Sequence, residues 1–194
     1  MNPTTPAGLT RQHIHTRQIT ANGFARSDGR WDIECELRDT KSYSFSNDDL
    51  QYREAGEPVH HMFVRLTLDD HMVVCEAFAE MRNTPFPECP GAVPPFANLV
   101  GSRIGKGWRA AVDAAMGDIR GCTHLRELLG VMATVAFQTM AGYKSKLRRE
   151  TGKGGYNATT PSQHMGKCLG WDFNGPVVAR IAPQFIGYER VRKG

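Results

Sequence analysis

Cys122 and His124 lie two residues apart in the stretch GCTHLRELL, where a glycine-containing loop changes into the longest helical pattern of the chain. A helix N-terminus stabilises anions, because its first N–H groups are unpaired and carry partial positive charge. Such a position lowers the pKa of a thiol and favours a bound anion, so Cys122 is a candidate substrate-binding residue. Three interpretations stay open: a Cys122–His124 nucleophile and base, a site to which only His124 contributes, or a structural helix start capped by Thr123.

The adjacent pair His60-His61 is a second candidate for proton chemistry. Side chains of neighbouring strand residues point to opposite faces of a sheet. His60 shares its face with the apolar residues Met62 and Val64, whereas His61 shares its face with Arg65. His60 is therefore either a histidine satisfied within the core or a pocket residue that acts as a general base.

Charged residues on the strands supply candidates for substrate binding. Glu34 is the middle one of three acidic residues that alternate with apolar ones, and this face is either solvated or covered. A covered carboxylate needs a cation, and Arg65 on the second hairpin is the expected partner. Glu34 is thus a candidate catalytic carboxylate, and Arg65, Arg26 and Lys41 are candidates for binding a substrate carboxylate.

The spacing of potential metal ligands argues against a metal site. Cys89, Cys122, His124 and Cys168 would make a tetrahedral zinc site only if the fold gathered them, and no C-x-x-C or H-x-x-x-H spacing is present. The glycines of LVGSRIGKGW do not form a phosphate-binding loop, and no flavin, nicotinamide or pyridoxal motif occurs. We expect no metal and no cofactor.

Composition narrows the class of protein further. The chain has 194 residues, of which 40% are hydrophobic and 23% charged, as in ordinary globular proteins. It has no apolar run long enough to span a membrane and no secretory signal, and its five cysteines suggest a reduced, cytoplasmic setting. The net charge is +4, and the basic segment 144–153 suits a solvated helix end better than a nucleic-acid interface.

Hydrophobic periodicity predicts the elements that position these side chains. Period-2 alternation over 17–43 and 59–82, with turns at SDGR and Asp69-Asp70, predicts two hairpins of an antiparallel sheet. A 3.6-residue period then predicts a long helix, starting near His124, that packs against this sheet. The fold class is α+β.

The remaining elements are expected to be short. Helices are predicted over 96–103 and 107–116, with an irregular proline-rich connector before them at 83–95. A last hairpin is predicted at Asn174-Gly175. Residues 1–16 are expected to be a flexible arm, and 17–194 a single domain.

Several stretches, in this order, resemble the bacterial domain of unknown function family 2889. They are GFARSDGRWDIECELRDTK, GEPVHHMFVRLTLD, CEAFAEMRNTPFPEC, LVGSRIGKGW, GCTHLRELL and C…W…NGPVV, within about residues 17–183. Two positions differ from the family pattern as we know it: His61 stands where an acid is common, and Leu169 follows Cys168 where a histidine is common. The resemblance extends to sphingomonad lyases that act on lignin-derived dimers.

This resemblance implies a cofactor-independent carbon–carbon lyase that releases formaldehyde from a phenylcoumaran-type aromatic acid and leaves a stilbene. Such a reaction needs a base, for which His60 and His124 are the candidates, and a proton donor for the departing phenolate. The alternative is a non-catalytic ligand-binding or accessory protein whose histidines are structural. The expected partner is a small aromatic molecule, with no nucleic acid or membrane, and assembly into a homo-oligomer stays open.

Overall fold

The computed structural model describes residues 9–47, 49, 51–152, 159–162 and 164–189. By their internal contacts the residues form two compact units, Met1–Tyr143 and Lys144–Gly194. The first unit contains the sheet and the second contains short helices. The expectation of one domain from residue 17 onward stays a prediction.

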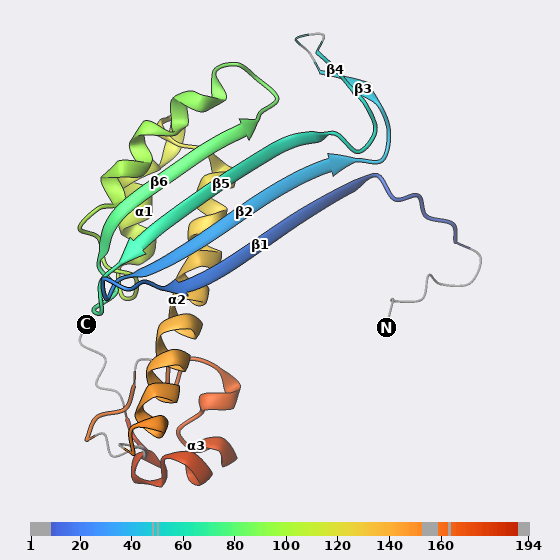
Figure 1. The fold of residues 1–194 in the computed structure, drawn as a ribbon. Coiled ribbons are helices and arrows are strands. Elements are labelled where there is room, and N and C mark those ends of the chain that lie inside the picture. Colours follow the sequence, from blue (N-terminus) through green and yellow to red (C-terminus); the bar gives the residue numbers. More distant parts are fainter. Residues whose placement is uncertain (1–8, 48, 50, 153–158, 163, 190–194) are drawn as a thin grey trace. The chain divides into compact units, whose positions relative to one another are not determined.

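Four long strands form the sheet of the first unit, and the fold class is α+β as predicted. The strands lie in the order β1-β2-β5-β6, and each neighbouring pair is antiparallel (Figure 1). Both predicted hairpins are confirmed, although β1 begins inside the expected arm. A separate two-stranded sheet lies in the polar stretch between the hairpins. The strands are β1 (His15–Ala25), β2 (Trp31–Lys41), β3 (Phe45–Ser46), β4 (Tyr52–Arg53), β5 (Pro58–Leu68) and β6 (Val74–Asn83).

Period-2 alternation gives the sheet one buried face, which we call the inner face, and one polar outer face. On β2 and β5 the inner apolar side chains are almost completely buried, while most of their sequence neighbours are partly exposed, with Thr67 as a buried exception. Burying such side chains contributes about 1.5–3 kcal/mol each to folding. The inner residues of these two strands are Trp31, Ile33, Cys35, Leu37, Met62, Val64, Leu66 and Leu68.

The long helix α2 (Thr123–Glu150) packs on the inner face, as its periodicity predicts (Figure 1). Its approach to β1 is so close that a Cβ atom on Gly23 would lie 1.9 Å from Oγ1 of Thr139. The shorter α1 (Trp108–Met116) packs beside it, and the Trp108 indole N–H donates to the Leu129 carbonyl at 3.1 Å. The buried residues of α2 are Leu125, Leu128, Leu129, Met132, Ala136 and Met140.

The proline-rich segments contain more regular structure than the sequence indicates. The connector at 83–95 includes the 3-10 helix η1 (Cys89–Ala92), and η2 (Pro94–Leu99) replaces the helix expected over 96–103. Both helices have proline in their first turn, where a missing N–H costs nothing. Proline at the first helical position likewise explains why α3 (Pro176–Ile181) follows Asn174-Gly175, where the prediction of a hairpin is wrong.

Three further 3-10 helices complete the elements: η3 (Asp118–Arg120), η4 (Leu169–Trp171) and η5 (Pro183–Phe185). In the second unit, Met165, Phe173, Val178, Ala182 and Phe185 form a small apolar core of their own. Among the described residues, no helix has the length and apolar content needed to cross a bilayer.

Candidate functional site

Three polar side chains form a row across the inner face, where the apolar stripe of the sheet ends. Strand register places Arg17 of β1 opposite Asp39 of β2, and Asp39 opposite His60 of β5. The alternation that buries Leu37 also buries Asp39, which is 3% exposed. The row is therefore a direct consequence of antiparallel register on a face with period-2 burial.

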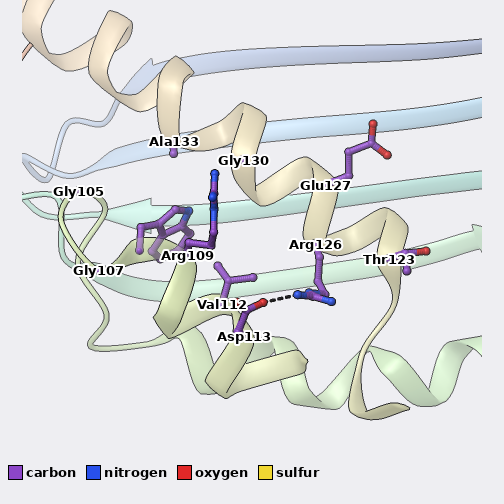
Figure 2. A pocket seen from close by; sticks show the side chains of 11 residues that line it. Gly105, Gly107, Arg109, Val112, Asp113, Thr123, Arg126, Glu127, Gly130 and Ala133 are labelled. Carbon is purple, nitrogen blue, oxygen red and sulfur yellow. Dashed lines mark hydrogen bonds and ion pairs between the residues drawn. The ribbon is translucent and has the colours of Figure 1, made fainter. Parts of the chain in front are cut away.

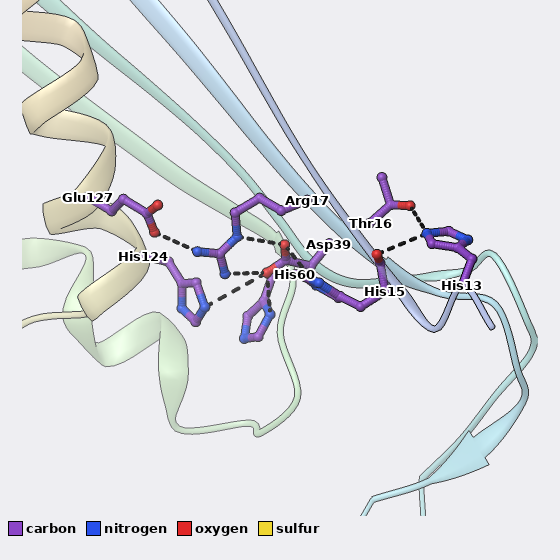
Figure 3. A network of polar contacts seen from close by, with 8 residues as sticks. All are labelled: His13, His15, Thr16, Arg17, Asp39, His60, His124 and Glu127. Carbon is purple, nitrogen blue, oxygen red and sulfur yellow. Dashed lines mark hydrogen bonds and ion pairs between the residues drawn. The ribbon is translucent and has the colours of Figure 1, made fainter. Parts of the chain in front are cut away.

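Arg17 neutralises the buried carboxylate of Asp39. Its Nε and Nη2 donate to the two carboxylate oxygens at 2.8 and 2.7 Å, and Nη1 donates to Glu127 of α2 at 2.5 Å (Figure 3). Burial alone would raise the pKa of Asp39, but the hydrogen bonds and charge of Arg17 outweigh it and lower this pKa. Asp39 is thus a fixed anion inside the protein.

Histidines surround this anion. His60 Nδ1 lies 3.2 Å from Oδ2 of Asp39, His124 Nε2 lies 3.8 Å from the same oxygen, and His15 Nε2 lies 3.4 Å from Oδ1. The His60 and His124 rings stack with their centroids 3.9 Å apart (Figure 3 shows the arrangement). Two imidazoles in contact are not easily both protonated to imidazolium cations, because like charges repel at this distance.

The start of α2 brings Cys122 and His124 to this row. The helix begins at Thr123, and the Cys122 carbonyl accepts the first helical bond, from the Arg126 N–H at 3.0 Å. Cys122 rather than Thr123 therefore occupies the N-cap position, and the predicted Thr123 cap is wrong. The Cys122 Sγ lies 3.6 Å from Nδ1 of His124, so residues two apart in the sequence do meet here.

A cavity of about 720 Å³ opens beside the two stacked histidines. Its size is typical of pockets for small organic molecules. Apolar side chains form much of the wall, and none of the described lining residues is lysine or arginine. The lining residues are His60, Met62, Pro85, Phe86, Glu88, Cys89, Gly91, Ala92, Ile119, Gly121, Cys122, Thr123 and His124.

Two titratable side chains at the cavity, those of His60 and Cys122, have lowered pKa values. Burial, together with the neighbouring His124, lowers the pKa of His60 to about 4, although Asp39 opposes this shift. His60 is therefore a neutral imidazole at physiological pH. Burial opposes ionisation of Cys122 too, but its hydrogen bond with His124 and two backbone N–H groups lower its pKa overall.

A second cavity, of about 760 Å³, lies between α1 and the first turns of α2 (Figure 2). Asp113 and Arg126 form an ion pair in its wall, and Gly130 and Ala133 form part of another side. Its described lining residues include no histidine or cysteine. We therefore place the candidate site at the first cavity, where titratable groups gather.

Asp39, His60 and His124 are close enough to be considered as metal ligands. Their donor atoms all lie within 4.8 Å of one another. However, Arg17 already donates to both oxygens of Asp39, and its cationic guanidinium would lie next to a bound ion. The Asp39 carboxylate thus already has its counter-ion.

The structure brings four of the residues selected from the sequence to one cavity. Cys122, His124 and His60 meet at the cavity, and Cys89 lines it. Cys168 belongs to the second unit. The grouping of histidines with the N-terminus of α2 follows from the packing of the helix on the sheet, which no sequence spacing reveals.

Glu34 and Arg65 lie opposite each other on the outer face, away from His60. The Arg65 guanidinium lies over the Phe78 ring at 5.7 Å, and its Nε has no hydrogen-bond partner among the described residues. The helix α2 covers the inner face instead. The buried carboxylate that needs a cation is therefore Asp39 and not Glu34.

The other two predicted cations also have different neighbours. Arg26, just beyond β1, pairs with Asp28 at 2.8 Å and with Asp32 at 3.4 Å near the hairpin turn. Lys41, two residues beyond Asp39, lies 3.9 Å from the centroid of the Phe45 ring. Neither residue lines the cavity.

Arg17 and Asp39 were not predicted from the sequence. The available signal was the apolar alternation of β2, which runs from Trp31 to Leu37 and then places Asp39 at the next inward position. A carboxylate that continues a buried stripe indicates a hidden cation or hydrogen-bond donor.

Comparison with known families matches residues 15–138 to the family described as "Protein of unknown function (DUF2889)". The matched segment is more than half of the chain and contains the Arg17–Asp39–His60 row, Cys122 and His124. Comparisons with curated proteins and with solved structures give no match. By its family match, the chain belongs to the DUF2889 family of proteins of unknown function.

Proposed function

We propose that the protein is a carbon–carbon lyase that releases formaldehyde from a lignin-derived phenolic dimer. One observation carries the proposal: a neutral histidine, His60, stacks on a second histidine at the wall of a largely apolar cavity. A base of this kind suits the removal of a proton from an alcohol or phenol. The resemblance to dimer-degrading lyases supplies the substrate class.

In the proposed reaction, His60 accepts the proton of a primary alcohol. The bond between the hydroxymethyl carbon and its neighbour then breaks, and formaldehyde leaves. The electron pair forms a carbon–carbon double bond and expels an aryloxide from the adjacent carbon, so that the product is a stilbene. The aryloxide takes up a proton, and the reaction needs no oxidant or reductant.

The chain's own residues hold the base in place. The Asp39 carboxylate accepts a hydrogen bond from the Nδ1–H of His60. The other ring nitrogen, Nε2, is then the atom that takes the proton of the substrate alcohol. Arg17 of β1 keeps Asp39 of β2 ionised, and it also donates to Glu127 of α2. Met62, Pro85 and Phe86 supply apolar walls for an aromatic ring.

The charge of the cavity wall indicates which end of the substrate binds there. Arg65 and Arg26, the sequence-based candidates for binding a carboxylate, have neighbours elsewhere, and Glu88 adds a negative charge to the wall. A phenolic, uncharged end of the dimer therefore fits this cavity better than its carboxylate end does.

The test is to incubate the full chain with a phenylcoumaran-type dimer and to measure formaldehyde and stilbene. We expect both products in equal amounts. The matched control is the same dimer with its primary alcohol methylated, which has no proton for His60 to take and should give neither product. Tight binding of the unmodified dimer without any formaldehyde would contradict the proposal and favour a non-catalytic ligand-binding protein.

A further inference from the structure

The cavity wall contains a sulfur atom that the proposed reaction does not use. Cys122 is half-buried, lines the cavity and has its Sγ 3.6 Å from Nδ1 of His124. Cys89 lines the same cavity, but no contact with a histidine accompanies it among the described residues. Cys122 therefore differs from Cys89 in having a histidine in contact with its sulfur.

His124 lies between two groups that can carry negative charge. The Cys122 sulfur faces its Nδ1, and the carboxylate of Asp39 faces its Nε2 at 3.8 Å. Each ring nitrogen of His124 therefore faces a group that can be anionic, with the sulfur within hydrogen-bond reach and the carboxylate in a longer ion-pair contact. The stacked His60 stays neutral, so it does not compete for this charge.

The surrounding charges are consistent with one cation at His124. Arg17 of β1 is shared between Asp39 of β2 and Glu127 of α2, which leaves one net negative charge among these three groups. Glu88, in the segment across the cavity, adds another. A cation at His124 would lie between these carboxylates and the sulfur, where contact with it stabilises a thiolate at Cys122.

We propose that Cys122 and His124 form a thiolate–imidazolium pair, and that the thiolate adds to aromatic conjugated carbonyl compounds in the cavity. The sulfur lone pair forms a bond to the β-carbon, the π electrons move to the carbonyl oxygen, and the resulting enolate takes the proton of His124. Thiol and acceptor thus combine to a thioether, with no electron gained or lost. The inference shares its cavity with the proposed lyase but does not depend on lyase turnover.

The other cysteines make the contrast measurable within one molecule. Cys35 is buried on the inner face, and burial raises its pKa to about 11. The Cys75 thiol of β6 donates to the Val73 carbonyl, with its sulfur 3.7 Å from the oxygen. Neither has a histidine in contact among the described residues.

The experiment follows labelling of each cysteine in the full-length wild-type protein by peptide mass spectrometry, first with iodoacetamide at pH 7. We expect Cys122 to react at least about tenfold faster than Cys75 and Cys89, because its contact with the His124 imidazole stabilises the thiolate. His124→Gln should remove this advantage, and His61→Gln, on the outer face, should preserve it. Equal rates for the three cysteines in the wild type would overturn the proposal without any variant.

A second probe tests the ligand class. Cinnamaldehyde should add to Cys122 with the mass of one intact molecule, whereas 3-phenylpropanal, its saturated analogue, should give no such stable thioether. Adducts spread over several cysteines, or none on Cys122, would contradict the assignment. These labelling assays contain no phenolic dimer. Their result therefore does not depend on whether the protein releases formaldehyde. An unreactive Cys122 in a protein that releases formaldehyde would overturn this inference alone.

Discussion

On the inner face of the sheet, His60 lies beside the buried carboxylate of Asp39; on the outer face, His61 lies 2.6 Å from the partly exposed carboxylate of Glu36. Both faces also carry an arginine on the carboxylate, Arg17 inside and Arg82 outside at 3.1 Å. Both groups consist of a histidine, a carboxylate and an arginine, but only the inner group lies under α2, and its histidine lines a cavity. Burial and packing, rather than composition, make one histidine a candidate base and leave the other a surface residue.

The largest effect on stability is expected from removing the inner arginine. Arg17→Met leaves the buried Asp39 without its counter-ion and should lower the free energy of unfolding by about 2–4 kcal/mol at pH 7. Arg82→Met, the matched outer variant, should cost no more than about 1 kcal/mol. Urea denaturation of both variants measures the difference.

The pH dependence of this loss has a definite sign. Arg17 lowers the pKa of Asp39, so its contribution is complete above the pKa of an unfolded aspartate and disappears as the pH falls through the lower folded value. The gap between wild type and Arg17→Met should therefore shrink in acid. Equal costs for Arg17→Met and Arg82→Met at pH 7 would contradict the distinction between the two faces.

Close packing of α2 on the inner face predicts a smaller effect at Gly23. In Gly23→Ala the new Cβ would overlap Thr139, and shifting the helix should cost about 1–3 kcal/mol. Gly130→Ala is the control, because no atom lies within 4 Å of its added Cβ and alanine favours a helix by up to about 1 kcal/mol. Thermal unfolding should give opposite signs for the two variants, and a stabilised Gly23→Ala would refute this contact.

The first-unit architecture could be predicted from the sequence because its signals are local. Alternation in β2 and β5 determines which side chains are buried, and it places His60 and His61 on opposite faces. The long helical period of α2 predicts its buried stripe. Those patterns require no knowledge of partners distant in the sequence.

The assembled site required tertiary information. Arg17 and Asp39 are 22 residues apart, and only the strand register makes them neighbours. Contact between His124 and His60 depends on where the start of α2 lies along the sheet. Glu34 appeared attractive as a carboxylate near Arg65, but periodicity alone cannot tell which face a helix will cover.

The rate of formaldehyde release should depend on pH as a neutral, buried base requires. Because the pKa of His60 is lowered to about 4, protonation should reduce kcat/KM only near that pH, and the rate should stay almost constant from about pH 5 to 7. The pH profile of kcat/KM for a phenolic dimer measures this. An inflection near pH 6.5, the value of an ordinary histidine, would show that the base is not His60.

The smallest expected effect is that of chelation. Asp39 has Arg17 as its counter-ion, so dialysis against EDTA should leave the rate unchanged, and elemental analysis should find no stoichiometric metal. Zinc at one ion per chain, lost together with activity, would instead assign Asp39, His60 and His124 as ligands. Cys89 and Cys122, which line the same cavity, would then also be candidate ligands.

The most direct measurement of the central claim compares His60→Gln with His61→Gln. Glutamine keeps approximate size and hydrogen bonding but cannot act as a base, and positioned bases contribute about 10²–10⁴-fold to rate. His60→Gln should fold with a nearly unchanged melting temperature and lose at least about a hundredfold in formaldehyde release, whereas His61→Gln should lose little. Full activity in His60→Gln would contradict the account and make His124 the next candidate; unfolding of His60→Gln would show that the histidine is structural.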